Sequence, residues 1–245
     1  MLTLDKVYHA KYVLKPVIRE TDVIHAPKIN PEAQIFLKTE NLQITGSFKV
    51  RGAYYKMSCL SDEEKSKGVI ACSAGNHAQG VALAAKKNGI RAVICLPDGA
   101  PISKVEATKS YGAEVCLVNG VYDDAYAEAL RQRDEYGYTF IHPFDDENVI
   151  AGQGTIGLEI LEQLPDVDQI VVPIGGGGLA TGVSTLAKLL NPHIKVIGVE
   201  PSGAACMKAS MEKGEVVTLP HVNTIADGTA VKTPGSKIFP YLQKN

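Results

Sequence analysis

The chain has 245 residues, 45% of them hydrophobic, which is enough to bury one large core or two smaller ones. Its 25 basic and 27 acidic residues nearly balance, so the net charge gives no reason to expect nucleic acid or an anionic membrane as a partner. The N-terminal segment lacks the apolar core of a signal peptide, and Pro173 and four glycines interrupt the longest uncharged run. We therefore expect a soluble, cytoplasmic protein that binds small molecules.

Short β-branched runs alternate along the chain with longer segments of helical periodicity, which is typical of βαβ units around a parallel sheet. The predicted strands are QIFLK, GVIACS, RAVICLP, AEVCLV, QIVVPI and KVIGVE. The predicted helices cover residues 76–88, 103–111, 121–136 and 178–190. Because ligands of open α/β sheets bind at the carboxyl ends of the strands, the turns after these strands are the places to search for a site.

Lys49 stands in the stretch TGSFKV at the expected start of a helix, between Phe48 and Val50. Most lysines only solvate a surface. An amine between apolar neighbours is poorly solvated as a cation, which lowers its pKa and makes it more nucleophilic. Lys49 is therefore a candidate reactive amine, provided that other loops supply a group for it to react with.

A glycine run follows the predicted strand QIVVPI and leads directly into a helix that begins near Leu179. Its members are Gly175, Gly176, Gly177 and Gly178. Backbone N–H groups in such a turn can converge on one anion, and the helix dipole adds to the attraction. The segment predicts a phosphate site. A flexible linker is the weaker interpretation, because the run lies between an apolar strand and an amphipathic helix.

The same segment permits a second interpretation. Gly175, Gly177 and Ala180 satisfy the pattern GxGxxA, and Glu200 ends the next strand about twenty residues downstream, as in a dinucleotide-binding fingerprint. This favours an NAD-dependent dehydrogenase. Such a site explains neither Lys49 nor the polar loop that follows the strand GVIACS.

That polar loop consists of Ser73, Ala74, Gly75, Asn76 and His77. A hydroxyl, an amide and the free N–H groups of a helix start can together bind a carboxylate or a phenolic oxygen. Ordinary N-capping by Ser73 or Asn76 would explain the loop if it stood alone.

Taken in this order, the motifs TGSFKVRGA, SAGNHAQGVA and GGGGLATG resemble the threonine and serine dehydratases among the fold-type II pyridoxal-phosphate enzymes. The resemblance extends over essentially the whole chain. It implies an α/β fold with two parallel-sheet domains of the tryptophan synthase β-like architecture. The large cofactor-binding domain would comprise residues 1–54 and 147–245, and a small inserted domain residues 55–146. Relatives continue past TPGSKIFPYLQKN, so we expect a C-terminally truncated large domain without its partner for the pyridine nitrogen.

The resemblance also implies roles for the matching residues. Lys49 would bind pyridoxal 5'-phosphate covalently as a Schiff base, with Phe48 packed beside it and Gly228 close to the ring. Asn76 would hydrogen-bond the ring oxygen, and the loop from Ser73 to His77 would bind the substrate carboxylate. The phosphate would lie in the turn formed by Gly175, Gly176, Gly177, Gly178 and Leu179. Residues 153–155 would line the cleft, and Arg51 is expected to form a salt bridge rather than to act in catalysis.

The implied reaction is β-elimination, which converts L-threonine to 2-oxobutanoate and ammonia, as in isoleucine biosynthesis, and L-serine to pyruvate. Related serine racemases carry a serine at the position of Ala74, so racemisation is not expected here. Metal-using relatives have an aspartate at the position of Cys206, and a thiol suits magnesium poorly, so no strong divalent-metal requirement is predicted. Relatives are commonly dimers or tetramers. The alternatives that remain are the NAD-dependent dehydrogenase and a catalytically idle ligand-binding module.

Overall fold

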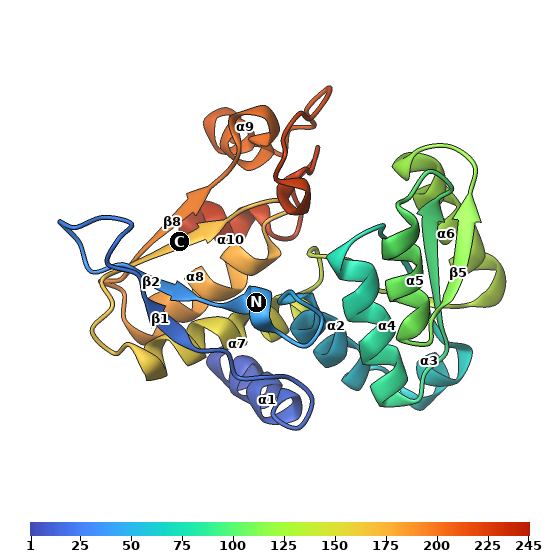
Figure 1. Cartoon of the computed structure of the whole chain (residues 1–245), viewed down its shortest axis with the longest axis horizontal. Helices are drawn as coiled ribbons and strands as arrows, with labels where there is room; N and C mark the ends of the chain where they lie inside the picture. The colour runs from blue at the N-terminus through green and yellow to red at the C-terminus, as the bar shows by residue number, and fades with distance from the viewer.

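The computed structural model describes residues 1–245, which form two groups of elements with α2 between them (Figure 1). The helices are α1 Leu4–Leu14, α2 Lys49–Ser58, α3 Asp62–Lys67, α4 Asn76–Asn88, α5 Ile102–Ser110, α6 Tyr122–Tyr136, α7 Glu147–Gln163, α8 Gly178–Leu190, α9 Cys206–Lys213 and α10 Phe239–Lys244, with short 3₁₀ turns at Glu40–Leu42, Ser202–Ala204 and Asp227–Thr229. The strands are β1 Val23–His25, β2 Phe36–Lys38, β3 Val69–Cys72, β4 Ala92–Pro97, β5 Glu114–Val118, β6 Thr139–Phe140, β7 Gln169–Pro173 and β8 Lys195–Val199. None of the helices is both long enough and apolar enough to cross a membrane.

The first group is built on a parallel sheet with the strand order β5-β4-β3-β6. Side chains of β3 alternate between the two faces, as strand geometry requires. Val69 and Ala71 join the core formed with α4, whereas Ile70 and Cys72 join the core formed with α6. β3 is therefore buried at every position, which explains why its sequence is uniformly apolar.

The second group contains the parallel pair β7 and β8, with α8 on one face. Ile170 and Val172 of β7 are buried, while Val171 between them is 60% exposed. On the same sheet Ile197 and Val199 of β8 are also exposed. The apolar run QIVVPI thus has one buried and one exposed face.

The orientation predicted for one strand is wrong. QIFLK was expected in a parallel sheet, but Phe36–Lys38 pairs antiparallel with Val23–His25, a strand that the sequence analysis did not predict. The connection between β1 and β2 covers only residues 26–35, and a parallel crossover needs a dozen residues or more.

Helix α7 lies in backbone contact with its neighbours because glycines face them. A Cβ at Gly152 would lie 2.6 Å from the carbonyl oxygen of Arg51 in α2, and one at Gly182 of α8 would lie 2.6 Å from that of Ile150. Gln153 and Thr155 are consequently buried in the middle of α7. The expectation that residues 153–155 line the cleft is wrong, because this segment packs α7 against α2 and α8.

Candidate functional site

Lys49 is the first residue of α2 and is partly buried. Its Nζ donates a hydrogen bond to the carbonyl oxygen of Pro143 at 3.1 Å and lies 5.2 Å from the centre of the Phe48 ring. Burial lowers the pKa of the amine from 10.5 to about 8, because the charged form loses its solvation. At a pKa of about 8, roughly a tenth of the amine is neutral, and nucleophilic, at pH 7, which is far more than for an ordinary lysine.

Helix α4 brings the asparagine loop to this lysine. A Cβ at Gly80 would lie 2.9 Å from the backbone of Lys49, so only glycine allows the two helices to approach so closely. At the start of α4 the N–H of Gly75 donates to Ser73 Oγ at 3.2 Å. The N–H groups of residues 76–78 donate no hydrogen bond within the chain, and the Asn76 side chain is exposed and also has no partner there. These donors are free to bind a ligand.

His77 differs from the rest of its loop. Its ring is buried, and Nε2 donates to the carbonyl oxygen of Ile141 at 2.8 Å. Burial, followed by the nearby Lys49 amine, lowers the pKa of His77 to about 3, so the ring is neutral. The imidazole is directed into the protein, and only the backbone N–H of His77 is left to serve the substrate-binding role predicted for it.

The glycine run has the geometry of an anion site. Gly177 adopts a φ of +101°, a left-handed conformation that favours glycine, and caps α8. None of the backbone N–H groups from Gly175 through Ala180 donates a hydrogen bond within the chain. Leu179 packs against the neighbouring core and fixes the first turn of the helix. The free donors and the positive end of the α8 dipole together favour a phosphate.

Gly228 approaches the same run from the C-terminal segment. Its carbonyl oxygen would lie 3.4 Å from a Cβ placed on Gly175. A Cβ on Gly228 itself would meet no atom within 4 Å. Packing within the chain therefore does not explain why this residue is glycine.

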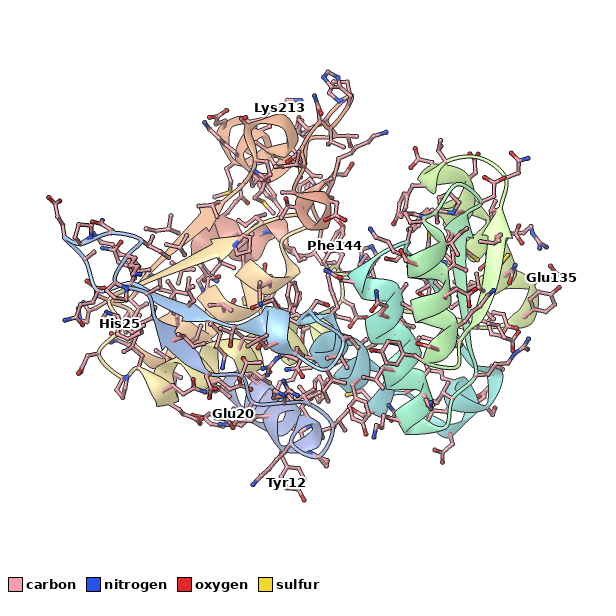
Figure 2. The ribbon with its side chains drawn as sticks, viewed as in Figure 1. Tyr12, Glu20, His25, Glu135, Phe144 and Lys213 are labelled. Carbon is pink, nitrogen blue, oxygen red and sulfur yellow. The ribbon has the colours of Figure 1, made fainter.

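The sequence analysis missed the turn that joins these parts, residues 142–145 after β6. The carbonyl of Pro143 accepts the Lys49 hydrogen bond, and Phe144 packs on the glycine run, where a Cβ on Gly178 would lie 2.9 Å from the Phe144 side chain. Figure 2 labels Phe144 between the two groups of elements. The sequence signal was the segment HPFDD, which indicates a site only once β6 is known to lie beside β3, because parallel strands end at one edge of the sheet.

Glu200 is engaged by the protein itself. Its carboxylate accepts hydrogen bonds from the N–H groups of Met207 at 2.9 Å and Lys208 at 2.8 Å, and so caps α9. A dinucleotide site would need this carboxylate for a ribose hydroxyl. Because the Glu200 carboxylate is already hydrogen-bonded within the chain, it is not free for a ribose, which weighs against the dehydrogenase interpretation. Cys206 is buried with its pKa raised to about 11 by burial, and the prediction about divalent metals stays a prediction.

Comparison with known proteins agrees with this arrangement. Residues 14–245 match the family model described as pyridoxal-phosphate dependent enzyme. The chain belongs to this family. An L-threonine ammonia-lyase of Thermotoga maritima is 50% identical over 246 residues, which cover 100% of this chain and 61% of the relative.

Two solved structures of the family superpose closely on the chain. The processed form of threonine deaminase isoform 2 from Solanum lycopersicum has a TM-score of 0.93 and 42% identity, covering 99% of this chain and 73% of that one. Maize serine racemase has a TM-score of 0.94 and 40% identity, covering 98% and 73%. The chain thus spans about three fifths to three quarters of the length of these relatives.

The residues present fit pyridoxal phosphate, the cofactor of the family. The Lys49 amine can bond an aldehyde carbon, and the free N–H groups of the glycine run can bind a phosphate. Gly228 leaves open space beside the run, where a side chain would otherwise project.

Proposed function

We propose that the chain catalyses the pyridoxal-phosphate dependent β-elimination of L-threonine to 2-oxobutanoate and ammonia, and of L-serine to pyruvate and ammonia. The observation that carries the proposal is the Lys49 amine, whose pKa is lowered to about 8, placed near two helix starts whose N–H groups are free. The names of relatives, including the L-threonine ammonia-lyase and the threonine deaminase, support the choice of substrate.

In this proposal the protein binds the cofactor at three places. Lys49 holds it covalently, the N–H groups from Gly175 to Leu179 hold its phosphate, and the exposed amide of Asn76 hydrogen-bonds its ring oxygen. Phe48 would pack beside the ring, and Gly228 would leave room close to it. When bound, pyridoxal phosphate supplies a conjugated ring that accepts electron density from the substrate α-carbon.

The chain's own groups then bind the substrate and move protons. The loop from Ser73 to His77 binds the carboxylate through its hydroxyl and its free N–H groups. Once the substrate amine has taken its place on the cofactor, the freed Lys49 amine would accept the α-proton; its pKa of about 8 in the unloaded chain makes the neutral, proton-accepting form accessible near neutral pH. The methyl side chain of Ala74 can neither give nor take a proton, so the residues present favour elimination over racemisation.

We also infer a domain division from the element order. Residues 55–146 hold the complete four-stranded sheet and would form the small domain, with 1–54 and 147–245 forming the large one. We expect the chain to form a homo-oligomer, as a dimer or a tetramer, which analytical ultracentrifugation would show.

The proposed activity is tested by loading the chain with pyridoxal phosphate and measuring ammonia and 2-oxo acid released from L-threonine and L-serine. We expect equal amounts of the two products and no release by Lys49→Ala. Binding of pyridoxal phosphate without product from either amino acid would favour a ligand-binding module. Consumption of NAD without ammonia would favour the dehydrogenase.

A further inference from the structure

We propose that His142 is a positioning residue, whose Nδ1 shapes the turn that presents the carbonyl of Pro143 to the Lys49 amine. The inference rests on the proposed function in one respect, namely that Lys49 is the reactive amine. It adds a residue that touches neither cofactor nor substrate and acts through the backbone of its neighbour.

The turn is closed by the histidine ring. Nδ1 accepts hydrogen bonds from the N–H of Phe144 at 3.2 Å and from the N–H of Asp145 at 2.8 Å. Both donors are backbone groups that can only donate, so Nδ1 carries no proton and the neutral ring carries its proton on Nε2. The Phe144 ring packs edge-to-face against the imidazole, with the two ring centres 4.6 Å apart, and this contact holds the imidazole in place.

The charges around the ring keep it neutral. The pKa of His142 is lowered to about 4, chiefly by burial; Asp145 and Asp146 oppose the shift, and Lys49 and Lys237 add to it. The buried ring of His77, on α4, is neutral as well. Burial outweighs the two carboxylates, so Nδ1 remains an acceptor at neutral pH.

The turn joins the amine to the glycine run. Proline has a fixed φ and no N–H of its own, so Pro143 offers the site only its carbonyl oxygen, 3.1 Å from Lys49 Nζ. The next residue, Phe144, packs on Gly176 and Gly178. Without the Nδ1 acceptor two N–H groups lose their partner, the turn opens, and water reaches Lys49. Because desolvation is the cause of the lowered pKa, hydration returns it toward 10.5.

Two substitutions separate the acceptor from the rest of the ring. In His142→Asn the side-chain oxygen stands where Nδ1 stands and can accept the same two N–H groups, as in an Asx turn. His142→Leu keeps apolar bulk and removes the acceptor. His193→Leu, at an exposed histidine remote from the turn, is the matched control.

The readout is the pH dependence of trace acetylation of Lys49, followed by mass spectrometry of its peptide, with neither cofactor nor substrate present. We expect a midpoint near 8 for the wild type, His142→Asn and His193→Leu, and a midpoint higher by about one pH unit for His142→Leu. An unchanged midpoint in His142→Leu would overturn the proposal, as would an equal shift in His142→Asn.

A second measurement serves if His142→Leu does not fold. The ¹⁵N spectrum of the wild-type imidazole at pH 7 should show the proton on Nε2, and a proton on Nδ1 would refute the inference. The two proposals can fail independently. If Lys49 titrates as expected in all four proteins but the loaded wild type releases no ammonia, the proposed function is wrong and the role of His142 stands.

Discussion

Replacing Arg51 with methionine tests whether a buried ion network holds α2, and with it Lys49, against the rest of the protein. Arg51 is fully buried. Its Nη2 lies 2.8 Å from a carboxylate oxygen of Glu40 and 2.9 Å from one of Glu159, which is also buried. Arg51→Met keeps much of the side-chain volume and leaves both carboxylates without this partner.

The expected loss of unfolding free energy depends on which partners Glu40 and Glu159 keep after Arg51 is replaced. Removing one partner of a buried ion pair costs about 3–5 kcal/mol, because the other charge stays buried and unpaired. Lys38 lies 2.6 Å from Glu159 and still pairs with it, and Glu40 is 12% exposed, so some water reaches it. We therefore expect the lower end, about 3 kcal/mol, which corresponds to a decrease in Tm of about 6–12 °C for a chain of this size.

Urea unfolding followed by circular dichroism measures the loss, with Arg131→Met as control. Arg131 pairs with Glu128 and Glu135 on α6 and is 57% exposed, so solvent screens both pairs and its removal should cost much less than the removal of Arg51. If Arg51→Met loses no more unfolding free energy than Arg131→Met, the buried network does not stabilise the protein and the reasoning is wrong.

Three further predictions concern packing, pH and reaction type. Gly152→Ala places a Cβ 2.6 Å from the carbonyl of Arg51 and should cost about 1–3 kcal/mol in urea unfolding, whereas Gly99→Ala, where a Cβ meets open space, should be nearly neutral; equal losses would contradict the packing account. The folded-state pKa values of His77 and His142, about 3 and about 4, lie below the ordinary 6.5, so the unfolded chain binds more protons and the free energy of unfolding should decrease as pH falls from 6.5 toward 4. A decrease of the same size in the double variant His77→Gln/His142→Asn would show that other groups cause it. The loaded chain should form pyruvate from L-serine much faster than D-serine, and Ala74→Ser should raise the D-serine share; comparable rates in the wild type would refute the role given to Ala74.

Local signals predicted the helices at the site well. The predicted ranges 76–88 and 178–190 agree with α4 and α8, because each helix follows glycine at its N-cap and has a clear apolar face. Arg51 was predicted to form a salt bridge, and this is confirmed, with Glu40 and Glu159 as its partners. Neither its complete burial nor these partners follow from the sequence, since they come from separate elements.

The parts that the sequence did not predict depend on tertiary contacts. β6 has only two residues, too few to show a period, and its pairing with β3 is what brings the HPFDD turn to Lys49. The ring of His77 could not be assigned an inward direction without knowing that Ile141 lies beneath it. The individual roles of Asn76, Gly228 and the glycine run stay predictions.

The attachment of pyridoxal phosphate to Lys49 is the central claim, and borohydride reduction followed by peptide mapping tests it most directly. The wild-type chain mixed with pyridoxal phosphate should show visible absorption that borohydride removes, and the reduced adduct should map to Lys49. Lys49→Ala should lose the absorption while its Tm stays close to that of the wild type, because the partly buried amine is not a core residue. An adduct on Lys56 or on any other lysine, with Lys49 unmodified, would contradict the account.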